Sequence, residues 1–276
     1  MHRLPQTIID SHVHLFPDRG YDAIWGYFDA AGVSILHKLY YKECVAYLKK
    51  RNVSPIVFSN YAHKKGFAEP MNQWNMEVLD QYDDLYCFAA YHPEDENALA
   101  YAEQVIGHPH VMGIKLHFQV QRIYPQDERL FPLYELIMAH GKRLLLHVGN
   151  GPTPNEFVGY HHLKKVLDRY PELPANIPHM GGYEFQAFID LLDDHPNLYL
   201  DTAYSFWPNL PFTFNLSNDY LEKHQDRILY GSDFPHIILP RRGEIDYLLS
   251  LGLSDAFYRK VFYENGKRLI ESVCPG

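Results

Sequence analysis

Two histidines near the start of the chain end a short apolar run, residues 8–15 (IIDSHVHL). In a β-strand, side chains two residues apart point to the same side, so His12 and His14 would present their imidazoles in one direction. A divalent metal ion can take such a pair as two of its ligands. The pattern alone is weak, because the chain contains 17 histidines and repeats it at residues 108–110 (HPH). Its meaning depends on whether other segments bring further ligands to the same point.

Histidine or aspartate also ends five later apolar runs, and one of these runs carries a lysine two residues before its final histidine. The residues concerned are Lys115, His117, His147, His179, Asp201 and Asp233. Imidazole and carboxylate groups bind Zn²⁺ and also suit Mn²⁺ or Fe²⁺. A carboxylate beside a metal-activated water can accept its proton, and Asp233 is the candidate for that role. His179 either binds a second ion or polarises the substrate and stabilises an oxyanion.

Each of these residues also has a simpler interpretation. A single buried histidine commonly pairs with a carbonyl group and does nothing more. Asp201 and Asp233 could each form a turn or a cap. The simpler interpretation weakens for the whole set, because chance would have to place His and Asp at the same end of several separate strands. Residues 108–110 precede a strand, so we interpret that second His-x-His as a loop feature at the opposite end.

The apolar runs alternate with helical patterns along the whole chain. Continuous apolar runs are typical of parallel strands that are buried on both faces. The predicted strands cover residues 7–15, 54–60, 85–92, 111–117, 143–149, 175–180, 198–203 and 228–233. The predicted helices cover residues 36–50, 73–82, 97–106, 130–140, 162–170, 184–193, 219–224, 243–251 and 254–270.

Eight strand-then-helix units in 276 residues predict an α/β protein with a single domain, a (β/α)8 TIM barrel over residues 1–276. The alternative is an open, doubly wound sheet, but no G-x-G-x-x-G follows the first strand to support its dinucleotide-binding form. The active site of a TIM barrel lies at the C-terminal ends of its strands. The candidate residues fall at those ends.

The composition limits the classes of partner. The chain has 25 Lys and Arg against 34 Asp and Glu, a formal charge of −9, which argues against a general nucleic-acid surface. No apolar stretch approaches the roughly 20 residues of a membrane span, and we expect no signal peptide. Three widely spaced cysteines, Cys44, Cys87 and Cys274, fit a reducing compartment, so we expect a cytoplasmic protein.

The motifs resemble those of the amidohydrolase superfamily of metal-dependent TIM-barrel enzymes. The similar segments run in order through the chain: residues 10–14 (DSHVH), 113–117 (GIKLH), 146–147 (LH), 179–182 (HMGG), 231–235 (GSDFP) and 265–269 (NGKRL). The resemblance is to the amidohydrolase-related branch, which includes aminocarboxymuconate-semialdehyde decarboxylase and also hydratases and lactonases. It implies that His12, His14, His147 and Asp233 bind the metal ion. It also implies that His179 is a second-site ligand or a catalytic residue.

Two departures from the wider superfamily narrow the expectation. Binuclear members bridge their two ions with a carboxylated lysine on the fourth strand, but here Lys115 has His117 beside it at the strand end. We therefore expect one ion, with Lys115 and His117 contacting the substrate, and a pair of ions as the alternative. Many cyclic-amide hydrolases also carry a small β-sandwich built from both termini. Too few residues precede the first predicted strand for that sandwich, so we expect the barrel without it.

Further substrate contacts are expected from the loops that follow the strands. Arg122 follows the fourth strand, Asn150 the fifth and Arg241 the eighth. The two arginines could pair bidentately with a substrate carboxylate, and Asn150 could make a polar contact. The long aromatic segment 16–33, after the first strand, is either a lid or a surface loop.

Three functions follow from these residues. The leading hypothesis is a hydrolase in which metal-activated water cleaves an amide, ester or lactone bond of a small molecule. The alternative is a metal-dependent, non-oxidative decarboxylase or hydratase that acts on a carboxylated substrate. The third is a barrel that binds a metal ion or ligand without catalysis. We expect Zn²⁺, with Mn²⁺ or Fe²⁺ as alternatives, no nucleic-acid or membrane partner, and allow for a homodimer.

Overall fold

Eight parallel strands form one sheet in the computed structural model, which describes residues 4–151 and 153–275. Each strand is hydrogen-bonded to the next in sequence order. The strands are β1 (Ile8–His14), β2 (Val53–Ser59), β3 (Leu85–Ala90), β4 (Val111–His117), β5 (Arg143–His147), β6 (Ala175–Ile177), β7 (Leu198–Asp201) and β8 (Ile228–Leu229). Each overlaps one of the eight predicted runs, so the prediction of a single (β/α)8 barrel is confirmed.

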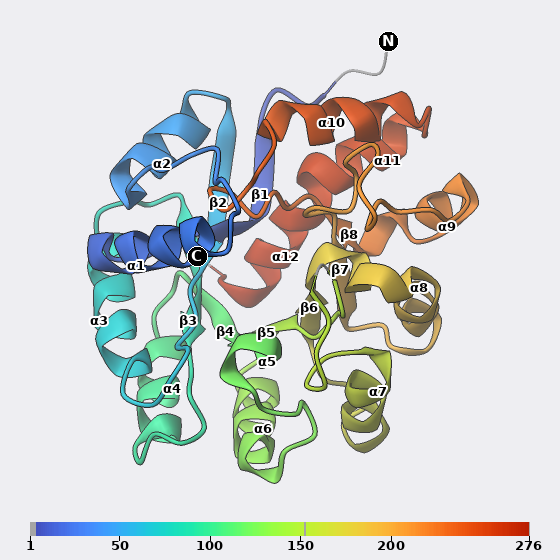
Figure 1. Cartoon of the computed structure of the whole chain (residues 1–276). Coiled ribbons are helices and arrows are strands. Elements are labelled where there is room, and N and C mark those ends of the chain that lie inside the picture. The colour runs from blue at the N-terminus through green and yellow to red at the C-terminus, as the bar shows by residue number, and fades with distance from the viewer. Residues whose placement is uncertain (1–3, 152, 276) are drawn as a thin grey trace.

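Helices surround the strands (Figure 1). They are α1 (Asp18–Ala30), α2 (Tyr41–Lys49), α3 (Ala68–Leu79), α4 (Ala98–Ile106), α5 (Phe118–Gln121), α6 (Phe131–Ala139), α7 (Tyr160–Arg169), α8 (Phe185–Asp194), α9 (Asn218–Lys223), α10 (Arg241–Ser250), α11 (Asp255–Arg259) and α12 (Asn265–Val273). The predicted helices all occur, and residues 254–270 contain α11, a π-helical turn at Lys260–Glu264 and the start of α12. Within the described ranges, none of these helices has the length and apolar character needed to cross a membrane.

Backbone hydrogen bonds close the barrel between β1 and the segment after β8. The Ser11 N–H donates to the Tyr230 carbonyl, and the His14 N–H donates to the Phe234 carbonyl, both over 2.8 Å. Between them, the Asp233 N–H donates to the carbonyl of His12, also over 2.8 Å. The main chain therefore holds Asp233 beside the two histidines of β1.

Apolar side chains fill the N-terminal end of the barrel. Interior residues of six strands pack against the C-terminal helix: Ile9, Val57, Phe88, Met112, Leu145 and Leu229, with Leu269, Ile270 and Val273 of α12. Asn265, the first residue of α12, donates to the carbonyls of Gln225 and Ile228 and ties the helix to β8. Because this end is packed with apolar groups, the polar residues of the interior gather at the C-terminal end.

The largest differences from the predicted strands are at β6 and β8. β6 ends at Ile177 and β8 ends at Leu229, whereas the predicted runs continue to Met180 and Asp233. In both places the chain turns into the left-handed region, with φ of 59° at His179 and also at Asp233. A residue in this conformation cannot continue an extended ladder, so the strand ends and the side chain takes a new direction.

Residues 16–33, expected to be a lid or a surface loop, contain the helix α1. Its anchor is Tyr21, whose buried hydroxyl donates to the carbonyl of His14 over 3.0 Å. The Tyr21 ring also stacks on Trp25, with 5.5 Å between ring centroids. The segment is therefore a helix fixed to the C-terminal end of β1 (Figure 1).

Candidate metal centre

A bulge in β1 lies between Asp10 and Val13, a stretch that includes His12 and precedes His14. Asp10 pairs with Ile56 and Val13 pairs with Phe58, so β1 has one more residue than β2 over this stretch. An extra residue of this kind changes the face on which the following side chains lie. His12 and His14 are both buried, and their ring centroids lie 5.0 Å apart.

Asp233 meets both histidines across the seam of the barrel. Its Oδ1 lies 2.9 Å from His14 Nε2 and 3.3 Å from His12 Nε2. One ligating atom from each of the three residues lies within 4.8 Å of the other two. Two imidazoles and one carboxylate are a donor set that suits Zn²⁺, Mn²⁺ or Fe²⁺.

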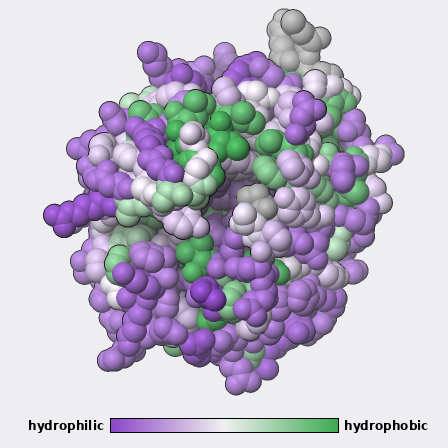
Figure 2. Space-filling view, in the orientation of Figure 1, coloured by the Kyte–Doolittle hydropathy of each residue, from purple (hydrophilic) through white to green (hydrophobic). Residues whose placement is uncertain are grey.

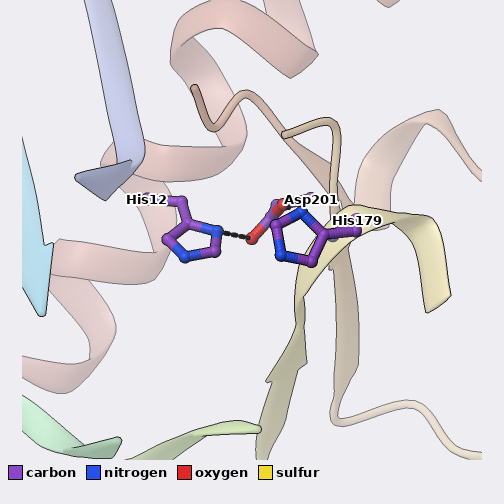
Figure 3. Close-up of side chains that lie close together, drawn as sticks. All are labelled: His12, His179 and Asp201. Atoms are coloured by element: carbon purple, nitrogen blue, oxygen red, sulfur yellow. Dashed lines mark hydrogen bonds and ion pairs between the residues drawn. The ribbon is translucent and has the colours of Figure 1, made fainter. Parts of the chain in front are cut away.

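Asp201 holds the other nitrogen of His12. Its Oδ2 accepts the Nδ1 proton of His12 over 2.9 Å, and its Oδ1 accepts the backbone N–H groups of His179 and Ala203. Figure 3 shows this bond between the ends of β1 and β7, with His179 beside it. A carboxylate on one imidazole nitrogen fixes the tautomer, which leaves Nε2 of His12 free to bind a metal ion.

His179 stands on an irregular turn after β6. His179, Met180, Gly181 and Gly182 all have positive φ values. A Cβ at Gly181 would come within 2.2 Å of the Phe188 ring, so only glycine fits there. The His179 Nδ1 donates to the carbonyl of Ala203 over 2.9 Å. Its Nε2 therefore carries a lone pair when the ring is neutral.

His117 and His147 lie side by side at the ends of β4 and β5. Their rings stack with centroids 4.0 Å apart and an interplanar angle of 12°. The His147 ring is 5.0 Å from that of His179, so all the predicted histidines gather at this end. Lys115 lies two residues before His117, and its side chain is completely buried.

Burial keeps three of these imidazoles neutral. It lowers the pKa of His12 to about 4, and it holds the pKa values of His117 and His147 well below the usual range of histidine. Neutral imidazole is the form that binds a metal ion, so at neutral pH no proton has to leave these rings first.

The acidic and basic groups of the cluster keep opposite charges. Burial alone would raise the pKa of Asp233, but the imidazoles of His14 and His12 outweigh it and bring that pKa below its usual range. Burial lowers the pKa of Lys115 to about 8, against the attraction of Asp233 and Asp201. At neutral pH, Asp233 is therefore ionised and Lys115 is mostly protonated.

Several buried polar atoms of the cluster are suited to binding a cation. Nε2 of His12 and Nε2 of His147 have no hydrogen-bond partner within the described residues, although both are buried. An unpaired buried nitrogen costs free energy unless a ligand or ion satisfies it. The structure brings His12, His14 and Asp233 together, and His12, His179 and Asp201 form a second group of three. His147 belongs to neither group and joins them through its contact with His179.

The residues predicted to contact substrate fall into two groups. The first group, Lys115 and His117, lies within the cluster, and their Nζ and Nδ1 atoms have no partner among the described residues. In the second group, Asn150 accepts the backbone N–H of Tyr183, and the guanidinium of Arg122 lies 6.0 Å from the ring centroid of Phe157.

Arg241, the remaining residue of that second group, lies inside the protein. Its side chain is 4% exposed, and Nη2 donates to Asp10 over 3.1 Å. In the structure the guanidinium is engaged by Asp10, and the substrate contact suggested by the sequence stays a prediction. The sequence does not indicate this ion pair, because Asp10 lies 231 residues away from Arg241 along the chain.

Aromatic rings line the approach to the histidines, a feature that the sequence analysis did not assign. Phe16 and Tyr61 lie 6.1 and 6.0 Å from the His14 ring, and Tyr204 lies 6.3 Å from the His179 ring. His236 is 5.4 Å from His14, and neither of its buried ring nitrogens has a partner within the described residues. Figure 2 shows a hollow near the centre of this face with hydrophobic surface along one side.

A family model described as amidohydrolase matches residues 9–271. A search of curated proteins gives no significant match. The match to the family model covers both halves of the cluster, from the histidines of β1 to Asp233 and the last helix.

Solved structures share the fold across nearly the whole chain. An uncharacterised TIM-barrel protein from Bordetella bronchiseptica has a TM-score of 0.73 and 20% identity, covering 97% of this chain and 99% of its own. A 5-carboxyvanillate decarboxylase from Novosphingobium aromaticivorans, solved with bound manganese, has a TM-score of 0.66 and 14% identity, covering 96% and 97%. A Pseudomonas putida protein described as a 2-pyrone-4,6-dicarboxylic acid hydrolase has a TM-score of 0.62 and 19% identity, covering 98% and 99%.

Proposed function

Since the chain belongs to the amidohydrolase family, whose members are metal-dependent hydrolases or decarboxylases, we propose that it hydrolyses an amide, ester or lactone bond of a small molecule. The observation that carries this proposal is the meeting of His12, His14 and Asp233 at the C-terminal end of the barrel. Active sites of TIM barrels lie at that end.

The proposed ligands are His12, His14, His147 and Asp233, as the resemblance implied. The unpaired Nε2 atoms of His12 and His147 support the choice, because a cation would satisfy both. We propose Zn²⁺ as the ion, with Mn²⁺ as the alternative that the manganese-bound decarboxylase suggests. A bound divalent ion lowers the pKa of water to about 7 and supplies a nucleophile near neutrality.

Two side chains are proposed to move protons. The ionised carboxylate of Asp233 accepts the proton of the attacking water, because its low pKa keeps it in the basic form. His179 presents the lone pair of Nε2, since Nδ1 is engaged by the carbonyl of Ala203. The ring can therefore accept a proton or bind a second ion directly, and it can donate to an oxyanion only after Nε2 gains a proton.

We propose that the substrate is small and planar. Substrates with and without a carboxylate group fit this proposal. Phe16, Tyr61 and Tyr204 provide ring faces beside the histidines, which favours a planar substrate. Lys115 and His117 are the proposed polar contacts, because both lie in the cluster with unpaired atoms. We also propose a cytoplasmic location, since Cys44, Cys87 and Cys274 are free and buried.

Decarboxylation is the second candidate function. It is favoured by the similarity in fold to the 5-carboxyvanillate decarboxylase and by the aromatic rings around the cluster. In that case the same ion would orient a carboxylated ring, and a protonated His179 would transfer a proton to carbon as CO₂ leaves.

One assay separates the two reactions. The protein, loaded with Zn²⁺ or Mn²⁺, is given lactones, esters, amides and aromatic carboxylates while acid or amine release and CO₂ release are followed in parallel. We expect acid or amine release, and a loss of roughly 100-fold or more in Asp233→Asn. CO₂ release without hydrolysis would assign the second function. A protein that retains no metal after loading would contradict both.

A suitable folding control is Arg143→Met. The buried guanidinium of Arg143 donates to Asn176 and to the carbonyl of Ala175, at the opposite end of the barrel. Its loss is expected to lower stability while leaving turnover per folded molecule unchanged.

A further inference from the structure

Asp10 is a buried carboxylate that the proposed reaction does not use. It lies on β1 two residues before His12, and its side chain has no exposed surface. Its Oδ2 accepts the hydroxyl proton of Ser232 over 2.6 Å, and its Oδ1 accepts the backbone N–H of Ser232 over 3.1 Å. A longer contact of 3.4 Å joins Oδ1 to the backbone N–H of His12. The Asp10 carboxylate therefore contacts the backbone of His12 and also Ser232, the residue before Asp233.

The hydrogen bonds between Asp10 and Ser232 constrain the backbone of Asp233, the next residue. Asp233 has φ of 59°, a left-handed conformation that is strained for a residue other than glycine and persists only where its surroundings hold it. Asp10 fixes the backbone before Asp233, and the Ser232 hydroxyl accepts the N–H of Phe234, after Asp233, over 3.2 Å. Both flanks of the strained residue are thus tied to Asp10.

Closing the barrel does not by itself require these bonds. The backbone bonds of Ser11, His14 and Asp233 already join β1 to the segment after β8. The hydrogen bonds from the Asp10 side chain add a second set of contacts. They fix the backbone orientation of the segment 232–234 relative to β1. That orientation decides where the Asp233 carboxylate points relative to His12 and His14.

Arg241 pairs with Asp10 in the interior of the protein. Its Nη2 lies 3.1 Å from Asp10 Oδ2, and its guanidinium lies 5.2 Å from the Tyr230 ring centroid. Burying a carboxylate with no charged partner is costly, and the pairing with Arg241 offsets part of that cost.

We propose that Asp10, paired with Arg241 and acting through Ser232, is a positioning residue that holds the carboxylate of Asp233 against His12 and His14. The inference rests on the proposed function, because it takes these three residues as metal ligands. Asp10 touches neither the ion nor the substrate. Its contribution is the geometry of the centre, in the way that partners of metal ligands elsewhere set ligand orientation.

Two variants test the inference without relying on turnover. Ser232→Ala removes one hydroxyl, and Asp10→Asn keeps the shape of the side chain but loses the charge that pairs with Arg241. We expect each to bind Co²⁺ or Zn²⁺ roughly 10- to 100-fold more weakly in a chelator competition. The visible spectrum of the Co²⁺-loaded protein should change as well, because it reports the geometry around the ion. Arg143→Met is the matched control, since it removes a buried arginine contact without touching the centre.

Thermal unfolding of the metal-free proteins separates positioning from general loss of structure. We expect Arg143→Met to lower the unfolding temperature while keeping the wild-type metal affinity and spectrum. Wild-type affinity and an unchanged spectrum in Ser232→Ala and in folded Asp10→Asn would overturn the positioning role and leave the proposed function intact. A wild-type protein that takes up no metal would overturn the proposed function, and this inference with it.

Discussion

His12 donates its Nδ1 proton to Asp201 over 2.9 Å while its Nε2 lies 3.3 Å from Asp233. One carboxylate thus orients the ring, and the other lies beside the nitrogen proposed to bind the ion. Gly231 makes room for this arrangement, because a Cβ there would come within 2.7 Å of His12 Cβ and 3.2 Å of Asp201 Cγ. Through its two ring nitrogens, His12 of β1 contacts both Asp201 of β7 and Asp233 in the segment after β8.

Replacing Asp201 by asparagine should weaken metal binding. The amide NH₂ would face Nδ1 of His12 and favour the tautomer with its proton on Nε2, which cannot bind a metal ion. We expect a roughly 10- to 100-fold loss of metal affinity in Asp201→Asn, measured by chelator competition. The backbone contacts of Asp201 Oδ1 with His179 and Ala203 can survive through the amide oxygen, so the fold should persist. Wild-type affinity in the folded variant would contradict the orienting role.

Adding a single methyl group at Gly231 should disturb the same pair. In Gly231→Ala the new Cβ presses on His12 and Asp201, and overpacking of this kind costs about 1–3 kcal/mol. We expect the variant to fold with a lower unfolding temperature and to lose metal affinity more than Gly252→Ala. At Gly252 a Cβ would meet nothing within 4 Å, although its φ of 70° makes alanine costly there too. Equal metal affinity in the two variants would argue against the close approach.

Most of the barrel can be predicted from the sequence because buried parallel strands leave a strong pattern. Runs such as residues 143–149 are apolar on both faces, and each is followed by a helical pattern. The same pattern places His12, His147 and Asp233 at one end of the barrel, since each falls at the end of its run. Fold and approximate site therefore follow from local properties of the chain.

Features that depend on distant partners escape this reasoning. The pair of Arg241 and Asp10 joins residues 231 positions apart, so the position of Arg241 after the eighth strand could not reveal this ion pair. Asp201 could be a turn residue or part of the site until its bond with His12 was visible. The left-handed turns at His179 and Asp233 shorten β6 and β8. Residue type alone does not predict these turns.

Acid should destabilise the metal-free protein. Histidines of the unfolded chain titrate near pH 6.5, whereas burial lowers the pKa of His12 to about 4 and that of His236 to about 3. Between these values the unfolded chain binds more protons, so stability is fully present above about pH 6.5 and falls as the pH drops toward 4. His12 alone would account for a loss on the order of 3 kcal/mol.

Urea unfolding of the metal-free protein at constant ionic strength measures this dependence. His236→Phe removes one of the buried histidines and keeps every proposed ligand residue, so its stability should fall less steeply with acid. A free energy of unfolding that stays level from about pH 7 to about pH 4.5 would show that these imidazoles are not buried in the neutral form.

Alanine at His147 should separate the ligand histidines from the other His-x-His of the chain. The unpaired Nε2 of His147 faces the cluster, so His147→Ala is expected to lower metal content and affinity while the strand remains folded. His110, by contrast, immediately precedes β4 at the opposite end, where its ring stacks on Tyr86 and its Nδ1 bonds the Leu85 carbonyl. His110→Ala should therefore keep the wild-type metal content and lose only a little stability. Metal analysis after gel filtration decides between them, and equal loss of metal in both variants would contradict the assignment of the site to the C-terminal end.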